Sequence, residues 1–108
     1  MKKNNLKSKV LKAANLVDYS KDSVVSYTLV DSDNGTVTAF AFDKGQGLSE
    51  HKAPFDAIVE IVDGEGMISI SGKEYRLVAG DMIIMPAGKP HSVKAIKKFK
   101  MMLTMIHS

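Results

Sequence analysis

The chain has 108 residues, a mass of 11.7 kDa and a net charge of +3, which is the size of one ordinary domain. Its 44% apolar and 25% charged residues are typical of a globular protein and exclude a wholly disordered chain. Its apolar runs are far shorter than the roughly 18 residues of a membrane-spanning helix. The lack of cysteine excludes disulfides, thiolate metal sites and thiol nucleophiles.

The first 22 residues predict a lead-in to a single domain that covers residues 23–108. Leu6, Val10 and Val17 lie at helical spacing, with two alanines between the valines, so this segment is either a short helix or an extended lead-in. No apolar run of the length of a secretory signal follows the first lysines. We therefore expect a cytoplasmic protein without a membrane partner.

Lysines form two groups that contain no acid, in residues 1–12 and 94–100. These groups hold nine of the fifteen basic residues, so six basic residues stand against all twelve acids in the rest of the chain. A basic patch can bind a nucleic-acid backbone, but neither group has an arginine for reading bases. We interpret both groups as solvated surface and expect no nucleic-acid partner.

From residue 23 onward, β-branched and aromatic runs alternate with turn residues. Asn34 and Gly35 predict a hairpin turn because both tolerate positive φ, and the run from Asp63 to Gly66 predicts the end of one strand and a hairpin into the next. This alternation of short strands and turns is typical of an antiparallel sandwich or small barrel. The predicted strands are residues 24–30, 36–42, 57–62, 67–71, 74–78, 82–85, 91–96 and 99–106.

Two spaced motifs lie in the second half of the chain. The first places His51 between Gly45 and Gly64, and the second leads from Gly80 through a Pro-Ala-Gly turn to His91. Together they resemble the two signature motifs of the cupin family. The resemblance implies an all-β fold, an antiparallel cupin barrel or double-stranded jelly roll, of the small single-domain type 2 class.

The cupin resemblance also implies a metal held by two histidines and a glutamate from the first motif and one histidine from the second. His51 and His91 match two of these positions, whereas Ala53 and Ala57 stand where the other histidine and the glutamate belong. A methyl group donates no electron pair to a cation. The implied metal site is therefore degenerate.

Two alternatives for the metal stay open. Two neutral imidazoles bind a cation weakly, because three or four protein donors are the norm, but His51 and His91 are good ligands for one divalent zinc, iron, nickel, manganese or copper ion. Asp56 precedes Ala57, and neighbouring strand residues face opposite sides of a sheet. Asp56 would join the two histidines only if a bulge near Pro54 turned it inward.

Two functions follow as hypotheses. The first is a non-catalytic module that binds a small molecule in a barrel made apolar by the two alanines. The alternative is a metal-dependent enzyme of the dioxygenase, isomerase or decarboxylase type that uses both histidines and a non-standard third ligand. No nucleophile and base stand out, so no catalytic residue is assigned. The expected ligand pocket is lined by His51, Ala53, Ala57, Val59, Ile61 and His91.

A homodimer is the expected assembly. Small cupins commonly pair, and a barrel of this size has exposed sheet edges that need cover. The apolar run Met82–Met85 and the strand 99–106 are the candidates for the contact surface.

Overall fold

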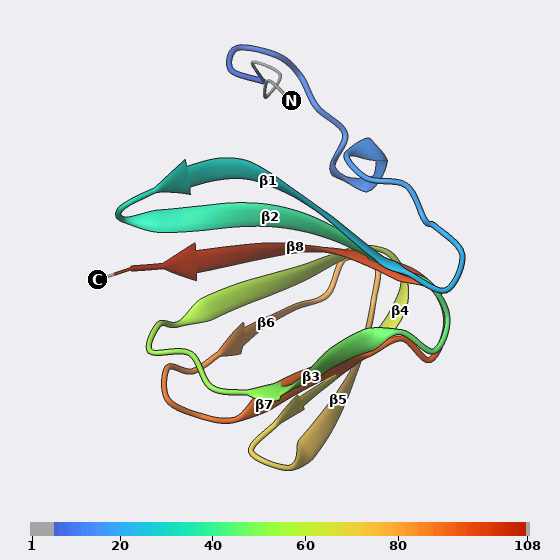
Figure 1. Ribbon diagram of the computed structural model, residues 1–108, viewed down its shortest axis with the longest axis vertical. Coiled ribbons are helices and arrows are strands. Elements are labelled where there is room, and N and C mark those ends of the chain that lie inside the picture. The colour runs from blue at the N-terminus through green and yellow to red at the C-terminus, as the bar shows by residue number, and fades with distance from the viewer. Residues whose placement is uncertain (1–5, 108) are drawn as a thin grey trace.

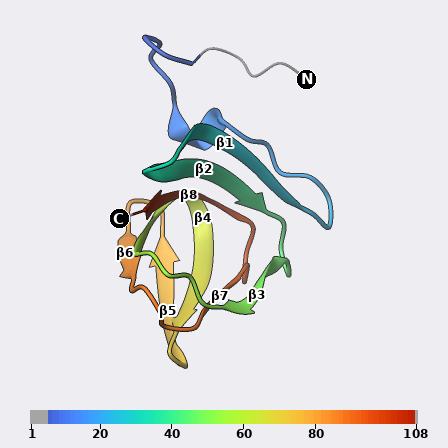
Figure 2. The same ribbon diagram turned by 60° about the vertical axis from the view of Figure 1, so that its left-hand side comes forward.

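Eight strands in the part of the chain that the computed structural model describes, residues 6–107, form one curled antiparallel sheet (Figure 1). This sheet has two parts that share the long strand β4 and are called the first and the second sheet below. The first has the strand order β1-β2-β8-β4-β6, and the second has the order β5-β4-β7-β3. Figure 2 shows how they curl around a shared interior, which confirms the all-β prediction. The strands are β1 Val24–Ser32, β2 Gly35–Phe42, β3 Gly47–His51, β4 Ala57–Ile70, β5 Lys73–Val78, β6 Met82–Met85, β7 His91–Lys94 and β8 Phe99–Ile106.

The predicted strand end and hairpin at Asp63–Gly66 are wrong. Strand β4 continues through these residues from one sheet into the other. Its register against β8 shifts between Ile61 and Asp63, and Gly64 adopts a φ of 76°. A side chain at Gly64 would overlap the Lys98 carbonyl. Gly64 therefore lets β4 bend and pass close to the neighbouring chain instead of turning back.

The two hairpins that the structure contains differ in their turns. The predicted β1–β2 hairpin is confirmed, but its turn residues are Asp33 and Asn34, and neither of these nor Gly35 has the expected positive φ. Gly35 is needed for a different reason, because an added Cβ would lie 2.5 Å from a carbonyl oxygen of β8. In the β4–β5 hairpin, by contrast, Ser71 and Gly72 have φ of 50° and 82°, and this turn is left-handed.

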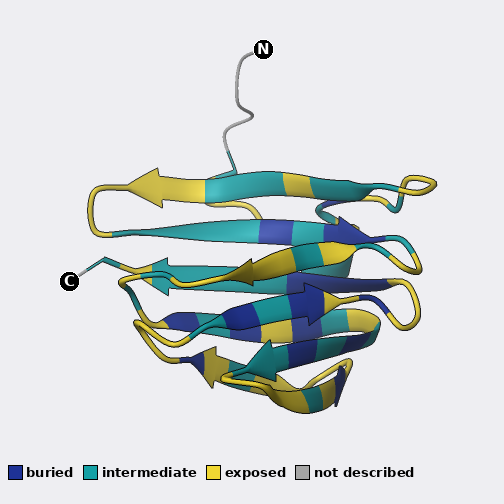
Figure 3. Cartoon of the chain, turned by 60° about the horizontal axis from the view of Figure 1, so that its bottom comes forward, coloured by how far each residue is buried: buried dark blue, intermediate teal, exposed yellow. Residues whose placement is uncertain are grey.

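Side chains that alternate inward along the strands fill the interior. Figure 3 shows the buried residues in dark blue. Phe42 and Phe99 stack at its centre with ring centroids 4.7 Å apart, and both are fully buried with Ile61 and Ile68. Burying each such side chain contributes roughly 1.5–3 kcal/mol. This core holds the two sheets together.

The lead-in forms no helix across its helically spaced residues. Its one helical element is a 3₁₀ turn, Ala13–Asn15, and it has further turns at residues 7–8 and 21–22. After the 3₁₀ turn it crosses the outer face of the first sheet, where Val17 is buried with Ala39 and Ala41. Helical spacing was misleading here because these apolar residues serve a sheet surface. Within residues 6–107 no helix has the length and apolar character needed to span a membrane.

Polar contacts also hold the lead-in to the barrel. The Tyr19 hydroxyl donates a hydrogen bond of 2.5 Å to Asp63 Oδ2, and Lys100 Nζ donates one of 2.6 Å to the Ala14 carbonyl. The Nζ atoms of Lys98 and Lys100 both lie 4.9 Å from the centre of the Tyr19 ring. Burial and the Asp63 carboxylate raise the pKa of Tyr19, so its hydroxyl stays a donor.

Candidate functional site

The two histidines singled out by the sequence meet in the structure. His51 ends β3 and His91 begins β7, and the two are register partners of neighbouring antiparallel strands. Their Nε2 atoms lie 3.0 Å apart, with the ring planes at 71°. His91 is 4% exposed whereas His51 is exposed. The pair therefore runs from the surface into the interior.

Backbone carbonyls determine which nitrogen of each ring carries the hydrogen. His51 Nδ1 lies 2.8 Å from the Ser49 carbonyl oxygen, and His91 Nδ1 lies 3.2 Å from that of Lys89. A carbonyl oxygen only accepts, so these contacts favour a hydrogen on Nδ1 of each ring. When both neutral rings carry it there, neither Nε2 has a hydrogen, and the ring centroids are only 4.3 Å apart, so the two lone pairs do not point straight at each other.

Two lone pairs at 3.0 Å repel each other unless a positive centre lies between or beside them. That centre can be a shared proton, the hydrogen of a ligand donor, or a cation. A proton on the buried ring is disfavoured: burial, and then the charge of His51, lower the pKa of His91, against a smaller opposing effect of the Lys89 carbonyl. A hydrogen-bond donor from a ligand would therefore stabilise the pair.

Apolar residues adjoin the pair. Ile70 of β4 is the register partner of His91, and Leu48 lies on the same strand as His51. Both are half-buried and pack against the core. Sequence reasoning missed both as site residues, although Ile70 alternates inward with the buried Ile68. A ligand at the pair would meet Ile70, the register partner of His91.

The rest of the expected pocket lies deeper. Ala57, Val59 and Ile61 alternate inward on β4, as the period of two requires, but they are closed within the core, and Val59 and Ile61 have no exposed surface. A ligand reaches them only if core side chains move aside. Ala53 is half-buried, and its carbonyl accepts a hydrogen bond from Gly88 N–H at 2.8 Å.

Asp56 lies in the β3–β4 loop and holds a neighbouring loop in place. Its Oδ1 accepts a hydrogen bond of 2.8 Å from the Ala87 N–H, in the loop that precedes His91. Together with the bond between Ala53 and Gly88, this ties the loop after His51 to the loop before His91. In this arrangement the carboxylate positions loops and is not grouped with the histidines.

The donor set does not fit a metal held by the protein alone. Within residues 6–107, no three His, Asp or Glu side chains gather in a way that could hold a cation, and a stable site ordinarily needs three or four protein donors. His51 and His91 supply two. A metal at this pair would therefore need a further donor from outside the two rings.

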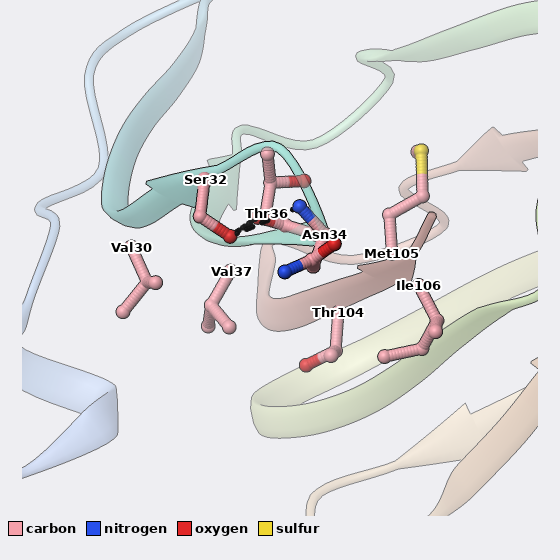
Figure 4. Close-up of a pocket in the computed structure, with 9 residues that line it drawn as sticks. Val30, Ser32, Asn34, Thr36, Val37, Thr104, Met105 and Ile106 are labelled. Atoms are coloured by element: carbon pink, nitrogen blue, oxygen red, sulfur yellow. Dashed lines mark hydrogen bonds between the residues drawn. The ribbon is translucent and has the colours of Figure 1, made fainter. Parts of the chain in front are cut away.

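A separate groove lies on β1, β2 and β8 and includes neither histidine. Figure 4 shows the side chains of Val30, Val37, Thr104 and Ile106 on one side of these strands, beside the tip of the β1–β2 hairpin. Ser32 Oγ donates a hydrogen bond of 3.2 Å to the Gly35 carbonyl across that tip. This groove is mostly apolar and open to solvent.

Known proteins resemble the chain over most of its length. Residues 39–107 match the cupin domain family. A conserved protein of unknown function from Streptococcus pyogenes is 38% identical, with a TM-score of 0.89 over 94% of this chain and 89% of that one. A cupin superfamily protein from Desulfitobacterium hafniense is 28% identical, with a TM-score of 0.90 over 98% and 97%.

More distant similarity extends to an enzyme. A salicylate 1,2-dioxygenase variant from Pseudoaminobacter salicylatoxidans is 16% identical, with a TM-score of 0.72 over 77% of this chain and 26% of that one. At this identity the likeness shows the fold alone. No curated protein matches the sequence.

Proposed function

This chain belongs to the cupin domain family, and from that premise we propose that it is a binding module that takes a small molecule at the His51–His91 pair. The main supporting observation is the geometry of the pair: the two Nε2 atoms lie 3.0 Å apart while each Nδ1 contacts a backbone carbonyl. Family membership alone chooses no function, since one fold hosts many. The proposal therefore depends on the pair and its surroundings.

The pair lacks a hydrogen-bond donor between its Nε2 atoms, and this determines the class of ligand. An O–H or N–H group that points between the two Nε2 atoms supplies the missing hydrogen and relieves the lone-pair repulsion. Ile70 and Leu48 offer half-buried apolar surface beside it. The module thus suits a small, partly apolar molecule with a hydroxyl or similar donor, such as a phenol.

A second candidate, a metal-dependent enzyme, is favoured by one observation. Metal–nitrogen bonds of roughly 2.0–2.1 Å at a right angle place two ligand nitrogens about 2.9 Å apart, close to the 3.0 Å between the Nε2 atoms. The divalent ion, whether zinc, iron, nickel, manganese or copper, would need a third donor from the substrate or from a rearranged Asp56. The class of reaction, whether dioxygenase, isomerase or decarboxylase, stays open.

Ligand binding tests the first proposal. We expect phenol to bind the protein measurably by calorimetry, and its methyl ether, anisole, to bind more weakly because it has no donor hydrogen. The double variant His51→Ala/His91→Ala should lose at least tenfold in phenol affinity, about 1.4 kcal/mol. His107→Ala is the matched control, since the His107 ring contacts Phe55 and not the histidine pair. Equal binding of phenol and anisole, or by the double variant, overturns the proposal.

Metal content separates the two candidates. Elemental analysis of untagged protein, as purified and after metal is added back, should find clearly less than one ion per chain if the pair is a ligand site. Near-stoichiometric metal that is lost in the His51→Ala/His91→Ala variant and kept in His107→Ala would replace the binding module with the metal-dependent enzyme. Screening of substrates would then follow.

A further inference from the structure

Two loops lie side by side next to the histidine pair (Figure 1). The first, residues 52–56, leads from His51 into β4, and the second, residues 86–90, leads from β6 into His91. The pairing of β3 with β7 ends at these two histidines and is irregular between Leu48 and His51. The strand ladder therefore stops at the two rings, and the loops beyond it determine how each ring is held.

The second loop contains a tight turn. The Lys89 N–H donates a hydrogen bond of 3.4 Å to the Pro86 carbonyl, and Gly88 has a φ of 76°. A positive φ at the third residue of a four-residue turn is typical of a type II turn, in which glycine is favoured at that position. The amides of the two central residues, Ala87 and Gly88, are not bonded within such a turn and need partners elsewhere.

The first loop supplies both partners. Asp56 Oδ1 accepts a hydrogen bond of 2.8 Å from the Ala87 N–H, and the Ala53 carbonyl accepts one of 2.8 Å from the Gly88 N–H. Asp56 is itself held by β8, because its own carbonyl accepts a hydrogen bond of 3.2 Å from the Ile106 N–H. Asp56 and the turn are exposed, so loss of the Asp56 carboxylate would loosen the turn without opening the core.

The same turn presents the carbonyl that orients His91. The Lys89 carbonyl oxygen lies 3.2 Å from His91 Nδ1. Pro90, between these two residues, is also held, since its carbonyl accepts a hydrogen bond of 2.8 Å from the Ser71 N–H. A hydrogen on Nδ1 leaves Nε2 of the neutral ring as the acceptor that faces His51. The position of the Lys89 carbonyl therefore governs which nitrogen of the ring carries the hydrogen.

We propose that Asp56 is a positioning residue that decides which nitrogen of His91 carries the hydrogen. Its carboxylate holds the Ala87 amide, this bond fixes the turn, and the turn presents the Lys89 carbonyl to the hydrogen on Nδ1. His91 Nε2 thereby stays open to the hydrogen of a ligand. The effect of Asp56 on ligand affinity rests on the proposed function, whereas its effect on the His91 tautomer does not.

Nitrogen NMR of the full chain, isotope-labelled in histidine, tests the proposal without any ligand. At about pH 8, with a chelator present, a histidine ring is neutral, and its nitrogen with a hydrogen resonates far from the one without. In the wild type the two His91 nitrogens should be well separated, with the hydrogen on Nδ1. In Asp56→Ala the two shifts should move toward each other, because the ring then exchanges between its tautomers. Asp56→Asn should keep the wild-type shifts, since its side-chain oxygen still accepts from the Ala87 N–H.

Two further variants separate this role from a purely structural one. Ala87→Pro removes the donor and keeps the turn, because proline suits the second residue of a type II turn. It should shift the His91 nitrogens as Asp56→Ala does, and the two changes together should add no further shift. Asp81→Ala is the matched control, because Asp81 Oδ2 accepts a hydrogen bond of 2.9 Å from the Val78 N–H in another exposed turn, between β5 and β6. Its loss should leave the His91 shifts unchanged.

Phenol binding measures the consequence at the proposed ligand site. Asp56→Ala should lose roughly threefold or more in phenol affinity, and Asp56→Asn should bind phenol as the wild type does. If the His91 shifts move as expected but the wild type binds no phenol, the proposed function fails and the positioning role stands. Circular dichroism confirms that each variant is folded.

Three results overturn the positioning role, independently of phenol. One is a wild-type His91 ring with its hydrogen on Nε2. Another is a set of His91 shifts that Asp56→Ala and Ala87→Pro leave unchanged. The third is a shift of the same size in Asp56→Asn or in Asp81→Ala, since the Ala87 hydrogen bond would then not be its cause.

Discussion

At the scale of single residues, hydrogen-bond partners decide the chemistry of the two histidines. The Ser49 and Lys89 carbonyls each occupy one Nδ1, which leaves both Nε2 atoms as acceptors. Sequence identified His51 and His91 as a pair, but it did not indicate which tautomer each adopts. That choice comes from carbonyls two residues before each ring, oriented by the ends of β3 and β7.

Burial of His91 predicts a pH dependence of stability. Its pKa in the folded protein is lowered from the usual 6.5, so below that pH the unfolded chain binds more protons than the folded one. The free energy of unfolding should therefore fall as the pH drops below about 6.5 and be constant with respect to this group at higher pH. Urea unfolding at a series of pH values, with a chelator present, measures it.

The His91→Gln variant is the comparison for this series. It should lose part of the slope of stability against pH below neutrality, whereas His107→Gln should retain it. A wild-type stability that rises on acidification in this range would show that the pair gains a shared proton more readily than burial penalises it.

At the scale of elements, strand β4 shows the limits of turn signals in sequence. The glycines that suggested a hairpin instead make room, since a Cβ at Gly66 would lie 2.7 Å from the buried Phe99 ring. The strand therefore crosses from the first sheet to the second without interruption. Whether a glycine marks a turn or a close approach depends on what packs against it.

Replacement of this glycine should be costly. We expect Gly66→Ala to reduce the free energy of unfolding by about 1–3 kcal/mol, because the fully buried ring has no space into which it can shift. Gly72→Asn is the control: its position in the β4–β5 turn is open, and asparagine tolerates positive φ. Urea unfolding of both variants checks this, and an equal loss at the two positions would contradict it.

At the scale of the whole molecule, the lead-in is part of the folded structure. It covers the outer face of the first sheet and is held by Tyr19, Asp63 and Lys100, residues far apart in the sequence. Nothing in the lead-in sequence indicated this partnership.

Removal of one hydroxyl tests this attachment. Tyr19→Phe should reduce stability by about 0.5–1.5 kcal/mol, the usual contribution of one hydrogen bond, and should speed proteolysis within the lead-in. Tyr75→Phe is the control, because the Tyr75 hydroxyl makes no hydrogen bond within the part of the chain that the structure describes. Equal protease sensitivity of the two variants would show that the Asp63 contact does not hold the lead-in.

Local pattern in the sequence was enough to determine the all-β class and most strand positions, whereas the family and the candidate pair His51 and His91 came from the resemblance of two spaced motifs. The period of two on β4 also correctly placed Ala57, Val59 and Ile61 inward. These features depend on neighbouring residues, whose alternation and turn preferences can be read along the chain.

Only the tertiary structure decided how deep those residues lie, what each histidine ring contacts, and which strands become neighbours. Strand β8, at the end of the chain, pairs with both β2 and β4, which are far from it in the sequence. The 3.0 Å approach of His51 and His91 likewise joins residues forty positions apart. Such contacts arise from packing across the barrel, and local propensity carries no information about which distant strand will be the neighbour.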